Sequence, residues 1–105
     1  MPRKSMTSLT ESMYYVLMAL QQRPMCGTDI ADHIEEKTRG RLRIGPATLY
    51  TVLAKFESEK YIREIETEGR KRTYSITEKG SAAYLAEVER LKLCLLDAQG
   101  GTDCE

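Results

Sequence analysis

The chain has 105 residues, of which 41% are hydrophobic and 30% charged, with equal numbers of basic and acidic side chains. This length allows one small domain, and the composition is that of a folded globular protein rather than a disordered chain. No apolar run approaches the roughly 20 residues that span a bilayer, and no signal-peptide core follows the basic N-terminus. We therefore expect a cytoplasmic protein.

The zero net charge hides an uneven distribution. Residues 39–74 hold nine basic and five acidic side chains, a net charge of +4, whereas residues 1–38 carry −1 and residues 75–105 carry −3. A local concentration of positive charge can attract a polyanion whatever the total charge. The cysteines form no closely spaced pair, so we expect reduced thiols and neither a disulfide framework nor a zinc site from Cys26, Cys94 and Cys104.

A first helix is predicted over residues 8–22. The stretch from Ser8 to Glu11 fits a capping box, and apolar residues recur at helical spacing as far as Leu20. Apolar side chains also widen this surface beyond one stripe, which is typical of a helix shared between a core and a partner subunit. Pro24 cannot continue the helix and ends it.

A second helix is predicted from Gly27 or Thr28 to Lys37, with Ile30 and Ile34 on its inner side. Its one histidine, His33, stands four residues after Asp29, a spacing that some metal sites use. With no second histidine and no cysteine pair, we expect a solvated histidine, no metal and no cofactor.

Residues 41–44 alternate between basic and apolar side chains. This pattern predicts a short strand or an extended connector with Leu42 and Ile44 pointing inward and Arg41 and Arg43 pointing to solvent.

A third helix is predicted from Pro46 to about Glu59. Proline suits the first helical position, because its missing N–H has no helical partner there. Apolar residues at helical spacing define the inner side: Leu49, Val52, Leu53 and Phe56. The outer side carries small and hydrogen-bonding residues without an acidic group: Ala47, Thr48, Tyr50, Thr51 and Lys55. Alone, this pattern fits an ordinary surface helix better than one that reads nucleic acid, and only its neighbours in the sequence favour the second interpretation.

A β-hairpin is predicted next. Residues 61–67 and 72–76 alternate, and Gly69 can supply the backbone angle that a tight turn requires. Three consecutive basic residues, Arg70, Lys71 and Arg72, occupy its tip and second strand. A basic tip is also common in loops that merely face solvent.

A last helix is predicted from an N-cap at Thr77 to residue 98, followed by a flexible tail over residues 99–105. Its apolar surface has nothing after it in the chain to cover it, which favours a partner subunit; the alternative is that it covers the first helix of its own subunit. The expected dimer contacts are Leu9, Met13, Leu17, Tyr84, Val88, Leu91 and Leu95.

The predicted order, three helices, a hairpin and a final helix, is that of a winged helix-turn-helix. We therefore predict a mainly α protein with a winged helix-turn-helix DNA-binding domain over residues 1–76 and a dimerisation helix over residues 77–98. In this fold the third helix enters the major groove and the hairpin lies over the adjacent backbone. The predicted DNA contacts are Arg41, Arg43, Ala47, Thr48, Tyr50, Thr51, Lys55, Arg70, Lys71 and Arg72.

Two stretches also resemble the PadR family. Residues 45–62 are similar to the family's "GTLYPLLKRLEKEGLI" segment, and residues 69–80 are similar to its "GRPRKYYRLTEKG" wing and helix start. The resemblance covers roughly residues 8–96 and is closest to the compact subgroup with a single C-terminal helix. It implies a dimeric transcriptional regulator, and most members are repressors.

The chain departs from the family pattern in places. Cys26 stands before Gly27 where many members have tyrosine, and the chain lacks the tryptophan with which some compact members bind flat hydrophobic compounds. A drug-sensing role is therefore not carried over. A cavity for a small hydrophobic effector stays open as a hypothesis, lined by Tyr14, Tyr15, Val88 and Leu91.

The resulting hypothesis is a homodimeric repressor that binds an inverted-repeat DNA operator and could be released by a small ligand. The alternative is a winged-helix module that binds proteins and not DNA, against which the basic middle third speaks. An enzyme is not expected, because the single histidine has no cysteine or serine partner in the sequence pattern.

Overall fold

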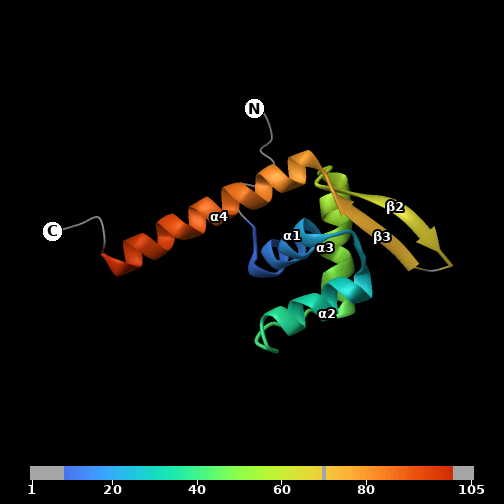
Figure 1. Cartoon of the computed structure of the whole chain (residues 1–105), viewed down its shortest axis with the longest axis horizontal. Helices are drawn as coiled ribbons and strands as arrows, with labels where there is room; N and C mark the ends of the chain where they lie inside the picture. Colours follow the sequence, from blue (N-terminus) through green and yellow to red (C-terminus); the bar gives the residue numbers. More distant parts are fainter. Residues whose placement is uncertain (1–8, 70, 101–105) are drawn as a thin grey trace.

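The computed structural model describes residues 9–69 and 71–100 (Figure 1). Ser8, Arg70 and Cys104 lie outside these residues. The predicted class, mainly α with a small hairpin, is confirmed: the described residues form a winged helix fold with three strands and four helices. In chain order the elements are α1 (Glu11–Gln22), β1 (Met25–Cys26), α2 (Gly27–Lys37), α3 (Pro46–Ser58), β2 (Ile62–Glu68), β3 (Lys71–Ile76) and α4 (Glu78–Gln99).

The core lies among α1, α2, α3 and the base of the hairpin. The predicted inner side of α3 is buried throughout, and so are Ile30 and Ile34 of α2. Each such side chain stabilises the fold by about 1.5–3 kcal/mol relative to an exposed position. The largest fully buried side chains are Phe56, Leu17, Ile30, Ile34, Leu53 and Val16.

Helix α1 begins later than predicted. Its N-cap is Thr10, whose hydroxyl accepts a hydrogen bond of 3.1 Å from the backbone N–H of Met13. Three residues after this cap stands Met13, which has no carboxylate to bond back to the cap, so the predicted capping box is replaced by a plain threonine cap. The cap satisfies one of the donors that the first turn would otherwise leave free.

The sheet contains a strand that the sequence pattern did not predict. Its order is β1-β3-β2, and β1 pairs antiparallel with β3 through Met25 opposite Tyr74 and Cys26 opposite Thr73. Two residues are too few to show a period, so only the pairing with β3 defines β1. The segment predicted around residues 41–44 is the extended connector rather than a strand; its inward-pointing Ile44 is buried.

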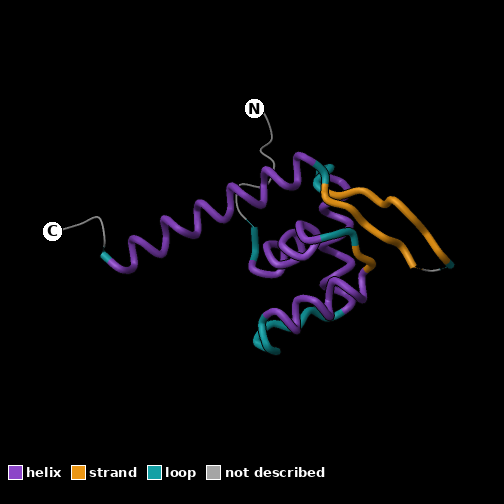
Figure 2. The backbone as a smooth tube through the Cα atoms, in the orientation of Figure 1, coloured by secondary structure: helices purple, strands orange, loops and turns teal. Residues whose placement is uncertain are grey.

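The hairpin extends away from the helical body (Figure 2). Gly69 has φ +63° at its turn, in the left-handed region that glycine adopts without strain. Only Ile62 in β2 and Tyr74 in β3 are buried, and the pairing shifts register between Glu64 and Glu66. The alternation of residues in the hairpin sequence therefore does not mean that one face of the hairpin is buried against the core.

Helix α4 starts on the body and then leaves it (Figure 1). Thr77 caps it as predicted, accepting from the Gly80 N–H at 3.1 Å. A β-carbon at Gly80 would collide with the carbonyl oxygen of Tyr61, so only glycine allows α4 to pack this closely on the residue before the hairpin. Beyond Val88 every described residue of α4 is exposed. None of the described helices is both long and apolar enough to cross a membrane.

Candidate nucleic-acid interface

The outer face of α3 is exposed to solvent. Pro46 occupies the start of the helix, and the buried inner side fixes which way the helix faces. The side chain of Tyr50 is 53% exposed. The remaining outer-face residues of the prediction are exposed as well: Ala47, Thr48, Thr51 and Lys55. This face therefore has the hydrogen-bonding surface, free of acidic groups, that a groove-reading helix needs.

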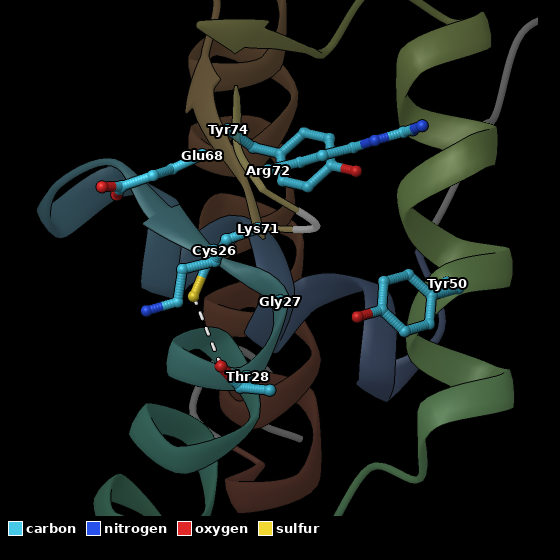
Figure 3. Close-up of a pocket in the computed structure, with 8 residues that line it drawn as sticks. All are labelled: Cys26, Gly27, Thr28, Tyr50, Glu68, Lys71, Arg72 and Tyr74. Carbon is cyan, nitrogen blue, oxygen red and sulfur yellow. Dashed lines mark hydrogen bonds between the residues drawn. The ribbon is translucent and has the colours of Figure 1, made fainter. Parts of the chain in front are cut away.

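A hollow of about 740 Å³ lies between this helix, the start of α2 and the hairpin (Figure 3). Three of the predicted contact residues, Tyr50, Lys71 and Arg72, line it together. In Figure 3 the Tyr50 side chain reaches from α3 into the hollow toward Gly27. Sequence reasoning missed the other lining residues, which are Cys26, Gly27, Thr28, Glu68 and Tyr74. No periodicity marks them, because they meet only when α2 and the sheet pack together.

Among the residues that the structure describes, the hollow is lined by two cationic side chains, Lys71 and Arg72, and by one carboxylate, that of Glu68. The guanidinium of Arg72 lies 3.9 Å from the carboxylate of Glu64, and both side chains are substantially exposed. Such surface pairs contribute little stability, so Arg72 can exchange this partner for another anion. Burial raises the pKa of Tyr74 above its ordinary value, although the nearby Arg72 acts in the opposite direction. Tyr74 therefore lines the hollow as an uncharged side chain.

The predicted arginines of the connector do not line this hollow. Arg41 turns toward α1, donating to the Tyr15 hydroxyl at 3.0 Å and to the Glu11 carboxylate at 3.2 Å. The hydrogen bond to Tyr15 is the larger cause, and the one to Glu11 the next, of a raised pKa of the Arg41 guanidinium. Arginine is charged at any pH that proteins meet. Arg43 lies 3.4 Å from Glu35, in a separate and more acidic hollow. The basic residues before α3 therefore form a surface distinct from the wing.

Two residues of the predicted dimer surface lie inside the subunit. Met13 and Leu17 belong to the core, and Leu17 is completely buried. Neither leaves an exposed side chain for a partner, which corrects the prediction for these two. Their helix is apolar on several sides because it is surrounded within its own chain. The other predicted contacts are half-buried or exposed: Leu9, Tyr84, Val88, Leu91 and Leu95.

The predicted effector cavity corresponds to a small hollow between α1 and α4. Tyr14, Tyr15 and Leu91 line it, whereas Val88 does not; its other walls include Glu87 and Arg90. Its volume of about 260 Å³ is below the range of about 300–1,000 Å³ typical of drug-sized sites. One subunit alone therefore offers a shallow hollow rather than an enclosing cavity.

The fold and this exposed helix with its neighbouring basic hairpin define a winged helix-turn-helix protein. The model of the transcriptional regulator PadR-like family matches residues 16–86. The chain belongs to this family, whose members are transcriptional regulators and not enzymes.

Comparisons with individual proteins agree with the fold. A transcriptional regulator from Clostridium thermocellum is 27% identical, with a TM-score of 0.76 over 87% of this chain and 92% of that one. A PadR-like transcription factor from Bacteroides fragilis is 22% identical, with a TM-score of 0.69 over 88% and 89%.

A curated relative matches a shorter region. It is an uncharacterized 37.1 kDa protein in transposon Tn4556 of Streptomyces fradiae, 38% identical over 65 residues, which are 62% of this chain. The match spans only 18% of that relative's length.

Proposed function

We propose that this protein is a sequence-specific DNA-binding repressor that acts as a homodimer on an inverted-repeat operator. The observation that carries the proposal is the common hollow of Tyr50, Lys71 and Arg72 beside the exposed outer face of α3. A helix in the major groove would bring one DNA backbone into this hollow. The α3 face would then contact base edges, and the two cations would contact phosphates.

The homodimer is supported by the second half of α4. Four leucines there are exposed, with Leu95 at 59%, although leucine is ordinarily buried. A second copy would cover them and place two α3 helices on one duplex. Binding of an operator that overlaps a promoter would then exclude the transcription machinery, which is the basis for proposing a repressor.

The test is the salt dependence of DNA binding. A duplex is first selected from a random DNA pool, and its affinity for the wild type and for the Lys71→Ala/Arg72→Ala variant is measured between 50 and 300 mM salt by fluorescence anisotropy. Each lost phosphate contact should flatten the slope of log K against log salt by about 0.9. We expect the double variant to bind more weakly and to lose about two units of slope.

The matched control is Lys37→Ala/Lys79→Ala. It removes the same charge from two exposed lysines that do not line the hollow. The control should keep the wild-type slope. If the wild type and the Lys71→Ala/Arg72→Ala variant have equal slopes of log K against log salt, the hairpin does not contact DNA phosphates. Failure to enrich any duplex, together with no binding to mixed-sequence DNA at 50 mM salt, would favour the protein-binding module instead.

A further inference from the structure

Tyr50 of α3 rests against the first residue of α2. A β-carbon built on Gly27 would lie 3.1 Å from the Tyr50 hydroxyl oxygen and 3.4 Å from two of its ring carbons, Cε1 and Cζ. These are the three nearest heavy atoms to that position outside the local chain. Gly27 is buried although it borders an open hollow.

The backbone itself does not require glycine at this position. Gly27 is not in the left-handed region, unlike Gly40 and Gly69, and it begins a regular helix after the extended residue Cys26. A glycine in a helix is less favourable than alanine by up to about 1 kcal/mol. The backbone at Gly27 would therefore accept a residue with a side chain, and the Tyr50 hydroxyl lies close to the position of the missing β-carbon.

This contact determines where the Tyr50 hydroxyl lies. The side chain is long and more than half exposed, so without a support it would sample several rotamers. Resting on Gly27, the ring points into the hollow toward α2, with the hydroxyl close to Gly27 (Figure 3). Lys71 lies across the hollow from Tyr50, and the Arg72 side chain reaches toward α3 on the same side as Tyr50 (Figure 3). A side chain held in its binding orientation loses less conformational entropy when it binds.

We infer that Gly27 is a positioning residue for DNA binding: by lacking a side chain it lets Tyr50 lie across the hollow, where its hydroxyl donates to a phosphate of the DNA backbone. This inference rests on the proposed function of the hollow. It assigns Tyr50 to the backbone rather than to base edges, and it leaves direct readout to the other residues of the α3 face. It also explains why a residue that donates no side-chain group lines the interface.

The variant Gly27→Ala tests the inference. The new methyl group would lie 3.1 Å from the Tyr50 hydroxyl oxygen, which is closer than an ordinary contact, so this oxygen has to move by a few tenths of an ångström. Because Tyr50 is exposed, its side chain can make this movement without disturbing the core. The fold should be retained with an unchanged or higher denaturant midpoint, since alanine favours the helix. DNA affinity should fall about tenfold, the effect of losing one hydrogen bond to a charged group.

The discriminating experiment is a double-mutant cycle with Tyr50→Ala, measured on the duplex selected for the wild type. Gly27→Ala should weaken binding about tenfold in the wild-type background and less than twofold in the Tyr50→Ala background. Tyr50→Phe keeps the ring on Gly27 but loses the hydroxyl, so it should also weaken binding, and Gly27→Ala should then add little. An equal loss in all backgrounds, or no loss in the wild type, would overturn the inference.

A second measurement separates this inference from the proposed function. In the free protein, NMR should show ring-current shifts of the Gly27 protons and their nuclear Overhauser contacts with the Tyr50 ring, and Tyr50→Ala should abolish both. Absence of these signals in the wild type overturns the positioning role even if DNA binds. Their presence in a protein that binds no duplex overturns the DNA-binding proposal, and with it the role assigned to Gly27 in that binding, while the contact itself stands.

Discussion

The environment of His33 differs from its prediction. The imidazole is half-buried on α2 rather than solvated, and its Nε2 atom is buried without a hydrogen-bond partner among the described residues. Burial lowers its pKa below the ordinary value of 6.5, and the nearby charges of Lys37 and Arg23 lower it further. The neutral form is therefore the one that the folded protein accommodates.

This environment predicts how stability depends on pH. Because the folded pKa lies below the unfolded one, the unfolded chain binds a proton more readily, and stability should be lost as the pH falls below 6.5. His33→Gln removes this titration. Urea unfolding at pH 7, 6 and 5 should show a steeper loss of midpoint for the wild type than for the variant. Parallel losses would mean that the imidazole is solvated after all.

Helix α4 has one half that packs on its own subunit and one half that is exposed to solvent. Its first half packs on α1, where the rings of Tyr14 and Tyr84 stack with centroids 5.6 Å apart. There Glu87 is only 5% exposed, and Arg90 donates two hydrogen bonds to its carboxylate. The second half has no support within the described chain. A solvated helix of this length needs packing against another surface to be stable, and a second α4 is the natural one.

The dimer proposal is tested by Leu91→Asp/Leu95→Asp. Two carboxylates on the exposed apolar face should prevent its burial against a partner, because an unpaired buried charge is strongly unfavourable. Light scattering should give a dimer for the wild type and a monomer or aggregate for the variant. The control Glu89→Ala/Lys92→Ala alters an exposed ion pair of the same helix and should stay dimeric. A monomeric wild type would refute the dimer.

The whole molecule is elongated because α4 extends from the body. Its extents are 59 × 41 × 22 Å, and its radius of gyration of 15.4 Å exceeds the roughly 13 Å expected for a compact chain of this size. A shape of this kind leaves α3 and the hairpin free at one end and the apolar half of α4 at the other (Figure 1). Dimerisation through α4 would therefore not obstruct the proposed DNA-binding face.

Two-fold symmetry of the dimer should appear in the operator. Sequences enriched from a random pool should form an inverted repeat with half-sites about 10 base pairs apart, or a multiple of this, since each recognition helix enters a major groove on the same side of the duplex. Inserting five base pairs between the half-sites should reduce affinity more than tenfold, because it turns them to opposite sides. Enrichment of a lone half-site, insensitive to this insertion, would contradict symmetric binding.

Features that repeat along one helix or strand were predictable from the amino-acid sequence. The period of α3 separated its buried side from its exposed side, and Gly69 between alternating runs located the wing. These patterns are readable because burial on one side imposes a period on the residues of a single helix, and because a tight turn requires particular backbone angles.

Contacts between separate elements became visible only in the packed structure. It showed β1, which exists through its pairing with β3, and it placed Met13 and Leu17 in the core because neighbouring elements cover α1 on several sides. It also showed that Arg41 donates a hydrogen bond to α1 and that the Tyr50 side chain packs on Gly27. Such contacts join residues far apart in the chain, and the spacing of residues within one element carries no information about them.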